Sequence, residues 1–224
     1  MNKRVLSLTL LLVCFSLVMQ AEGRIVEPFN SGWVFKKAPA GKELAVNAPK
    51  WESGWTEVEI PHTWNAKDMQ TQYDQFYEGP AYYKKHYFFP AELKDKRVFL
   101  RFEGVGAVAE VYVNGSLVTT HKGAYSAFSC EIGTALKPGA DNEIIVKADV
   151  IPINHVLFGV YGGMYRPVWL IVTEPYNICV TDCASSGVYI TQKNVSKKQA
   201  DVKVKVKLDN GTLQPAPLTL QNTI

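Results

Sequence analysis

The clearest signal along the chain is an alternation of apolar and polar residues with a period of two. Val98, Leu100 and Phe102 occupy alternate positions of one short run, with basic or aromatic residues between them. Such alternation predicts β-strands that turn one face toward a core. No stretch after residue 24 keeps a helical period. The segments expected as strands are 56–60, 83–89, 97–102, 110–113, 116–120, 143–150 and 167–173, followed by 178–181, 188–191 and 202–208.

Turn residues between these segments define the class of fold. Asn114-Gly115 joins two strand patterns and is the strongest short hairpin signal, because a type I′ turn needs positive φ at both positions. Strands at this spacing, joined by turns, are typical of an antiparallel sandwich. We therefore expect an all-β chain in which residues 24–175 form a jelly-roll β-sandwich of about eight to ten strands.

A domain boundary near Glu174-Pro175 is expected to separate this sandwich from a second unit at residues 176–224. Three strand patterns follow the boundary and a fourth begins at Leu218, whereas an immunoglobulin-like sandwich needs about seven strands. The second unit is therefore predicted to be an incomplete immunoglobulin-like sandwich. Lysines alternate with aliphatic residues over 202–208, and we interpret them as a solvated face that discourages edge pairing rather than as an anion site.

The first residues are typical of a targeting signal. Lys3 and Arg4 precede a mostly apolar stretch that is shorter than the roughly 20 residues of a spanning helix. This pattern predicts a secretory signal peptide at residues 1–23 and a secreted or periplasmic protein that has no membrane contact after cleavage. Cys14 raises a lipoprotein alternative, which we disfavour because Val13 is not the small residue that such a signal places before its cysteine.

Composition and charge exclude several classes of protein. Apolar residues make up 47% of the chain, enough to bury a core, so the chain is not expected to be disordered. A net charge of +3 is too small for a nucleic-acid binder. No His or Cys cluster has metal-ligand spacing, so we expect neither a metal nor a cofactor. Cys130, Cys179 and Cys183 remain after signal cleavage, and pairing of the last two stays open.

Five motif segments carry a family resemblance. They are Trp33-Val34-Phe35, Ile60-Pro61-His62-Thr63-Trp64-Asn65, Tyr77-Glu78-Gly79-Pro80, Val111-Tyr112-Val113-Asn114-Gly115 and Gly162-Gly163-Met164-Tyr165-Arg166. In this order and spacing they resemble the N-terminal sugar-binding domain of glycoside hydrolase family 2, the family of β-galactosidases, β-glucuronidases and β-mannosidases. Residues 176–224 are similar to the start of the immunoglobulin-like domain that follows in that family. The second and fifth motifs are closest to the β-galactosidase forms.

The resemblance implies a retaining glycosidase, in which one Glu is the acid/base and a second Glu is the nucleophile. In the family both lie in a later (β/α)₈ barrel, which needs about 250 residues by itself and cannot fit in this chain beside a sandwich. We therefore assign no catalytic residue here and expect the chain to be inactive alone. Its expected partners are the missing barrel and, through it, β-linked sugars. Asn142-Glu143 mimics the family's acid/base pair, but we interpret it as a turn Asn followed by an outward Glu.

One loop of the sandwich has a functional role in the family. It precedes the Gly-Gly motif and reaches the active site, where an Asp of β-galactosidases can bind sugar hydroxyls. The matching segment 153–161 of this chain has no Asp, and its strongly polar side chains are Asn154 and His155. These two are the candidate substrate-binding residues. The alternative is a loop that packs its own apolar side chains.

The remaining motif residues are expected to be architectural. His62 is interpreted as a partly buried, hydrogen-bonded histidine, because no nucleophile or base partner stands near it. Trp64, Trp169 and Tyr125 are expected in the core rather than as sugar platforms. Arg166 is expected to pair with a carboxylate, or to cap carbonyls, where domains meet.

Three hypotheses follow for function. The leading one is the N-terminal portion of a secreted retaining β-glycosidase of the β-galactosidase type, acting in carbohydrate metabolism. The first alternative is a stand-alone carbohydrate-binding module, because jelly rolls often hold glycans by stacking on aromatic rings. The second alternative is a non-catalytic assembly module that forms a homo-oligomer.

Overall fold

The computed structural model describes residues 23–38, 53–66, 77, 79–150, 161–212 and 214–221. Its strands are β1 (Arg24–Pro28), β2 (Trp33–Lys37), β3 (Thr56–Val58), β4 (Pro80–Phe89), β5 (Arg97–Phe102), β6 (Val108–Val113), β7 (Ser116–Lys122), β8 (Phe128–Glu131), β9 (Ala140–Asp149), β10 (Val168–Thr173), β11 (Tyr176–Ile178), β12 (Val188–Lys193), β13 (Asp201–Val206) and β14 (Leu208–Asn210). Two short 3₁₀ turns, η3 (Ala91–Leu93) and η4 (Gly133–Ala135), are the helical elements of the described residues.

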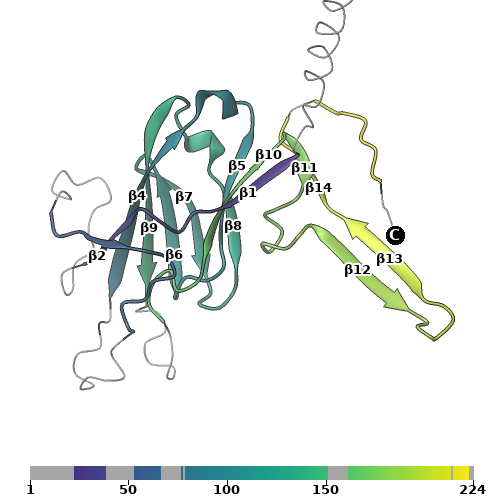
Figure 1. Ribbon diagram of the computed structural model, residues 1–224, viewed down its shortest axis with the longest axis horizontal. Coiled ribbons are helices and arrows are strands. Elements are labelled where there is room, and N and C mark those ends of the chain that lie inside the picture. Colours follow the sequence, from purple (N-terminus) through teal and green to yellow (C-terminus); the bar gives the residue numbers. More distant parts are fainter. Residues whose placement is uncertain are drawn as a thin grey trace, which may run out of the picture.

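The front of the chain is a sandwich of two antiparallel sheets (Figure 1). One sheet has six strands in the order β3-β2-β4-β9-β6-β7, and the other has four in the order β1-β10-β5-β8. The ten strands β1 to β10 match the number expected from the spacing of patterns and turns. The predicted all-β class and the sandwich are confirmed.

The core between the sheets follows from the alternation in the sequence. Val98, Leu100 and Phe102 of β5 are fully buried and pack in the same cluster as Ile144 and Val146 of β9, which belongs to the other sheet. Each such side chain stabilises the fold by about 1.5–3 kcal/mol through its removal from water. The strand at 97–102 therefore has the bounds that its pattern predicts.

The hairpin between β6 and β7 is also as predicted. Asn114 and Gly115 have φ angles of 50° and 79°, the left-handed values that a type I′ turn requires. The Asn114 side chain also forms hydrogen bonds. Its Nδ2 donates to the carbonyl of Ala135 and to Oδ1 of Asn142, both at 2.8 Å, so the turn is tied to the neighbouring strand β9.

Asn142 differs from its predicted role as a turn residue. It lies inside β9, is fully buried, and its Nδ2 donates to the carbonyls of Ala140 at 2.9 Å and Lys137 at 3.2 Å. Its Oδ1 accepts from the Lys137 backbone N–H at 2.7 Å. A buried amide is stable only when its polar atoms are bonded in this way. Glu143 is a half-buried residue of the same strand, and its carboxylate lies 3.9 Å from Nζ of Lys84.

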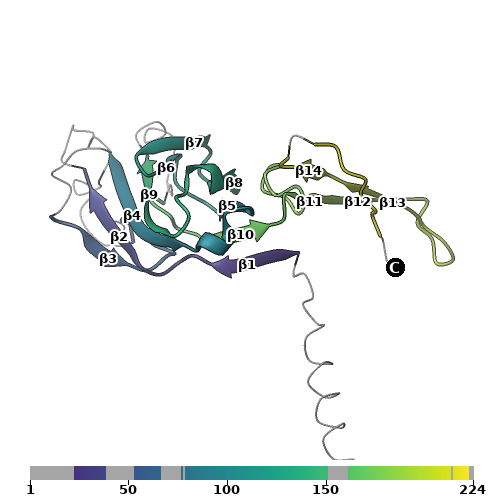
Figure 2. The same cartoon turned by 90° about the horizontal axis from the view of Figure 1, so that it is seen from above.

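Beyond β10 the chain forms a second unit of two two-stranded sheets, β11-β14 and β12-β13 (Figure 2). The pattern at 202–208 gives two strands rather than one, because the chain changes its partner at Lys207. The Lys207 N–H donates to the Gly187 carbonyl at 2.8 Å, and its carbonyl accepts from the Cys179 N–H at 2.9 Å. The strand expected at 178–181 ends instead at Ile178, where it pairs with Leu208 of β14.

The β12-β13 ribbon has two solvent-exposed faces. Lys203 and Lys205 are exposed, which confirms the predicted solvated lysine face. The aliphatic face is exposed as well, since Ile190 and Val204, which are cross-strand partners, are 62% and 41% exposed. In the part of the chain that the structure describes, no element covers this face.

The two units meet on the outer face of the four-stranded sheet. Phe99 of β5, Ile171 of β10 and Val180 of the second unit form a small buried cluster. Arg97 lies beside it and donates to both carboxylate oxygens of Glu131, at 2.9 and 2.7 Å, and to Oδ1 of Asn177 at 2.9 Å. An arginine whose donors reach both units joins them in a fixed geometry.

The three cysteines of the described residues are free thiols. Burial raises the pKa of Cys130 to about 12, so this thiol is unreactive. Cys179 is buried and Cys183 is exposed, and the pairing left open by the sequence is not formed. No helix of the described residues is long and apolar enough to cross a membrane. Residues 1–22 of the predicted signal peptide lie outside the described residues.

Candidate functional site

Two motif segments that are far apart in the sequence lie side by side at one end of the sandwich. The His62 N–H donates to the Met164 carbonyl at 2.8 Å, and the Trp64 N–H donates to the Gly162 carbonyl at 3.3 Å. Oδ1 of Asn65 accepts from the Gly162 N–H at 2.7 Å. The Pro-His-Thr-Trp-Asn and Gly-Gly-Met motifs thus form one structural unit.

Both glycines of this unit are required by close packing. A Cβ on Gly162 would lie 2.2 Å from the Trp64 ring. A Cβ on Gly163 would lie 2.2 Å from the Tyr83 hydroxyl, and its φ of 111° is itself unfavourable for other residues. The motif therefore lets two aromatic side chains approach the backbone.

His62 has the structural role that the sequence predicts. Its Nδ1 is 2.8 Å from the hydroxyl of the buried Tyr83, and its ring lies 4.7 Å from that of Phe35. Burial, and then the positive charge of Lys37, lower the pKa of His62 below its ordinary value. Burial also raises the pKa of Tyr83, so both groups stay neutral near pH 7. Among the described residues, no Ser, Thr or Cys side chain forms a hydrogen bond with the His62 ring.

Trp64 belongs to the core, as predicted. It is 8% exposed and stacks on Phe35 at a ring separation of 6.0 Å, with the edge of Tyr77 against it at the same distance. Its Nε1 is buried, and no described residue forms a hydrogen bond with it. The Tyr77 hydroxyl donates to the Pro80 carbonyl at 2.7 Å, and burial raises its pKa to about 12.

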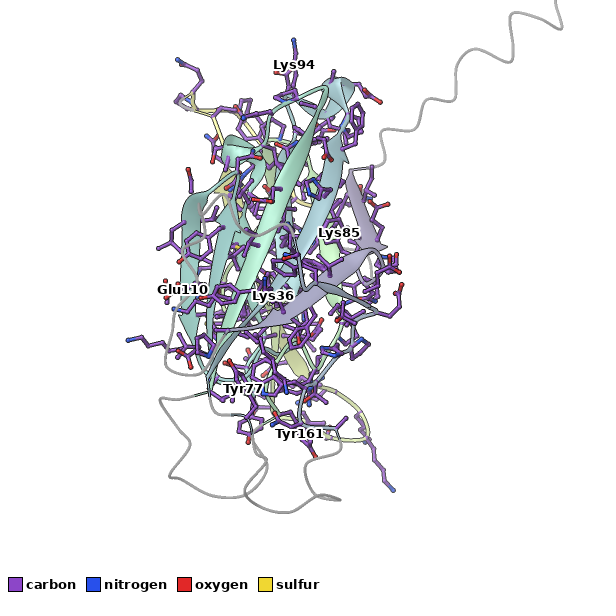
Figure 3. All side chains as sticks on the ribbon, turned by 90° about the vertical axis from the view of Figure 1, so that its left-hand side faces the viewer. Lys36, Tyr77, Lys85, Lys94, Glu110 and Tyr161 are labelled. Carbon is purple, nitrogen blue, oxygen red and sulfur yellow. The ribbon has the colours of Figure 1, made fainter. Side chains whose placement is uncertain are left out.

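The outer part of this end is richer in exposed aromatic side chains than the sequence predicts. Tyr161 is 52% exposed and its ring lies 5.8 Å from that of Tyr165. Figure 3 shows Tyr77 and Tyr161 at the same end of the sandwich, opposite Lys94. Tyr125, which was expected in the core, is 62% exposed, so that prediction is wrong.

Arg166, whose expected pairing with a carboxylate or with carbonyls stays a prediction, lies beside Tyr165. It is exposed, and its guanidinium lies over the Tyr165 ring at 5.9 Å. No carboxylate of the described ranges forms an ion pair with it. The junction between the two units is instead made by Arg97, whose guanidinium also lies 3.6 Å from Asp209. Sequence reasoning missed Arg97 because nothing in the run 97–102 distinguishes it from an ordinary exposed strand residue.

Trp169 was expected in the core and is only half-buried. It lies on the outer face of the four-stranded sheet, against the cluster of Phe99, Ile171 and Val180. The candidate substrate-binding residues Asn154 and His155 lie outside the described residues. Because both lie outside the described residues, their expected contact with sugar stays a prediction. In the sequence, their segment leads into Tyr161 and Gly162.

The described residues at this end offer aromatic rings and hydrogen-bonding groups. Within the described ranges no group of three or more His, Cys, Asp or Glu side chains could hold a metal ion. Within the motifs, His62 is hydrogen-bonded to Tyr83 and Asn65 to the Gly162 backbone. An end of this kind can contact a substrate or another domain through tyrosines and through the adjoining loop.

Comparison with known proteins gives the family. Residues 56–155 match the family described as "Glycosyl hydrolase 2 galactose-binding domain-like". A β-glucuronidase of Bacteroides fragilis is 35% identical over 211 residues, which cover 92% of this chain and 29% of that enzyme. The chain therefore belongs to glycoside hydrolase family 2, and it matches the family's sugar-binding sandwich.

Solved structures agree with this assignment. A putative β-galactosidase from Bacteroides fragilis matches with a TM-score of 0.80 and 68% identity, over 87% of this chain and 30% of that one. A Bacteroides uniformis β-glucuronidase matches with a TM-score of 0.75 and 30% identity, over 84% and 22% respectively. This chain thus spans less than a third of the length of the relatives it matches.

Proposed function

We propose that this chain is the N-terminal region of an exported retaining β-galactosidase. The observation that carries the proposal is the 68% identity to a putative β-galactosidase structure over 87% of the chain. The Pro-His-Thr-Trp and Gly-Gly-Met-Tyr-Arg motifs, which form one unit at the end of the sandwich, support the same branch of the family.

In this proposal the sandwich positions other parts of the enzyme and cleaves no bond itself. Retaining hydrolysis needs two carboxyl groups about 5 Å apart, one as acid/base and one as nucleophile. Glu143, which mimics the family's acid/base in sequence, lies beside Lys84 in a sheet. The two catalytic carboxylates would come from the region of the relatives that this chain does not cover.

The loop before Tyr161 is the part of the sandwich proposed to meet the substrate. Asn154 and His155 would donate to, or accept from, sugar hydroxyl groups there, in place of the Asp of related β-galactosidases. In the full-length gene product, Asn154→Ala and His155→Ala should then raise KM for the galactoside more than they lower kcat. Unchanged kinetics in both variants would favour the alternative of a loop that packs on itself.

The decisive experiment compares two substrates on the full-length gene product, expressed with its native N-terminus. We expect hydrolysis of an aryl β-galactoside with retention of configuration and at least tenfold lower kcat/KM for the matching β-glucuronide. Mass spectrometry of the exported protein should show a start after residue 21 or 23. Residues 24–224 alone should hydrolyse neither substrate. Turnover by that chain, abolished by Glu143→Gln, would contradict the proposal.

A second candidate is a β-glucuronidase, because the curated Bacteroides fragilis relative has that name. The same assay separates the two activities, since a β-glucuronidase must favour the carboxylate-bearing substrate. A preference for the glucuronide would replace the galactosidase assignment and leave the assignment of the sandwich to this family unchanged.

A further inference from the structure

A groove of about 340 Å³ lies between the outer face of the four-stranded sheet and the segment that follows β11. Trp169, Arg101 and Glu103 line it from the sheet, and Val180 and Ser186 line it from the second unit. Figure 2 shows these two parts of the chain facing each other beyond β10. The volume lies at the lower end of the range of ligand pockets, about 300–1,000 Å³.

The strand register places an aromatic ring beside a polar pair. Trp169 of β10 is directly opposite Arg101 of β5, so the two side chains are neighbours on one face. Nε of Arg101 donates to Oε1 of Glu103 at 2.9 Å, and Nη2 is 3.5 Å from Oε2. Both charged side chains keep more than a quarter of their surface exposed, at 29% and 28%.

The inner end of the groove is apolar and closed. Phe99, Ile171 and Val180 are buried against each other there, and Trp169 packs on this cluster while remaining half-buried. One part of the Trp169 side chain therefore packs against this cluster, which fixes the ring, and the rest of the ring is exposed to solvent. A ring that is fixed in this way loses little entropy when a ligand stacks on it.

We propose that this groove binds one pyranose unit of a β-linked oligosaccharide. The apolar face of the sugar ring would lie against Trp169, and its hydroxyl groups would meet Arg101 and Glu103. A hydroxyl both donates and accepts, which suits a site that has a donor and an acceptor side by side. An arginine has five N–H donors, and the bonds to Glu103 use two of them.

Three charged side chains, Arg24, Arg101 and Glu103, line the groove. The positive charge of Arg101 is compensated by Glu103, with which it forms an ion pair. Arg24 keeps its charge, and its Nη2 donates to the Ile178 carbonyl at 2.5 Å. These charges do not favour a neutral sugar over a uronic acid, so the ligand class is a β-linked hexoside recognised by its ring face and its hydroxyl groups.

The test is a titration of residues 24–224 with β-1,4-galactobiose, followed by the indole N–H signals of the NMR spectrum and by tryptophan fluorescence. We expect saturation with a Kd on the order of 1 mM, typical of a small solvent-exposed site. Trp169→Ala should weaken binding at least tenfold, and Glu103→Gln should weaken it severalfold.

Two further variants keep the result interpretable. Trp55→Ala is the matched control, because Trp55 is also half-buried but lies beside Lys36 and Lys84 of the six-stranded sheet, so binding should be unchanged. Ser186→Trp fills the groove from its exposed side without removing Trp169, and it should abolish binding in a folded protein. This variant decides the question if Trp169→Ala fails to fold.

Three outcomes would overturn the proposal. They are no binding at ligand concentrations tenfold above 1 mM, binding that survives both Trp169→Ala and Ser186→Trp, and loss of the Trp169-dependent signal in the full-length gene product. The last outcome would mean that another part of the enzyme covers the groove. None of these results bears on which aryl glycoside the full-length enzyme cleaves, so this proposal and the proposed function can fail separately.

Discussion

His62 shows how a residue with catalytic chemistry is used for structure. Its ring contacts the rings of Phe35 and Tyr83, and its backbone N–H donates a hydrogen bond to the Met164 carbonyl. Burial disfavours the charged imidazolium, and the nearby Lys37 acts in the same direction. Because folded His62 holds its proton more weakly than an unfolded histidine, acid favours the unfolded state.

This linkage predicts a pH dependence of stability. The contribution of His62 is fully present above the unfolded pKa of about 6.5, and it is lost as pH falls through the lower folded pKa. Urea unfolding of residues 24–224 should therefore show a free energy of unfolding that declines from pH 7.5 to pH 5. In His62→Gln the decline should be shallower over that range, whatever the stability of the variant at pH 7.5.

His86→Gln is the control for this prediction. His86 is 60% exposed and 2.7 Å from Asp141, so this variant removes a surface imidazole and leaves the buried ring cluster of His62 intact. Burial lowers the pKa of His121 as well, so part of the decline should persist in His62→Gln. An unchanged slope in His62→Gln would show that its proton affinity is the same in the folded and unfolded states.

At the scale of elements, the strand β5 supports both units of the chain. Its inward residues, such as Leu100, form the sandwich core, while its outward residues Arg97 and Phe99 contact the second unit. The hydrogen bonds to Glu131, strengthened by its charge, raise the pKa of Arg97. The Gly211 backbone lies close against the Arg97 side chain, where a Cβ would be 2.6 Å from Cδ.

Arg97→Lys should loosen the second unit without unfolding the sandwich. Lysine cannot make the bidentate bond to Glu131 and reach Asn177 at the same time, so we expect a loss of about 1–3 kcal/mol at the junction. Limited proteolysis with chymotrypsin should cleave residues 176–221 faster, while the rate of cleavage in the sandwich stays the same. Arg166→Lys, at an exposed arginine over Tyr165, should leave both rates unchanged. Equal rates in Arg97→Lys would contradict this account of the junction.

At the scale of the whole molecule, the two units differ in how they bury apolar surface. The sandwich has a continuous core between its two sheets, whereas the β12-β13 ribbon exposes an aliphatic face. Ribbons of two strands are only marginally stable by themselves. An exposed strand with apolar side chains and unpaired edges is also a site of self-association.

The exposed face predicts how residues 24–224 behave at high concentration. Replacing the cross-strand pair Ile190 and Val204 by threonine keeps β-branched side chains but removes apolar surface. Light scattering should show less self-association in this double variant than in the parent chain. The control is the neighbouring cross-strand pair, Thr191 and Lys203, whose side chains point to the other face of the ribbon. The double variant Thr191→Ser with Lys203→Arg should leave self-association unchanged. If both double variants associate like the parent, another surface is responsible.

The local pattern of the sequence predicted several strands that bury one face, but it missed β8, whose Phe128 and Cys130 are buried. At 97–102 the alternation alone gives the bounds of β5, and Asn114-Gly115 gives the hairpin, because a turn with positive φ depends on those two residues. The ordered motifs also determined the family. These are properties of neighbouring residues, and neighbouring residues are what a sequence displays directly.

Only the tertiary structure decided which residues far apart in the chain meet. Tyr125 is exposed, Asn142 is buried, and Arg97 joins the two units, each contrary to or absent from the sequence-based expectation. Burial of a loop or a strand's outer face depends on whether a distant segment covers it, and no local pattern encodes that. The groove beside Trp169 exists for the same reason, since Arg101 and Val180 reach it from different units.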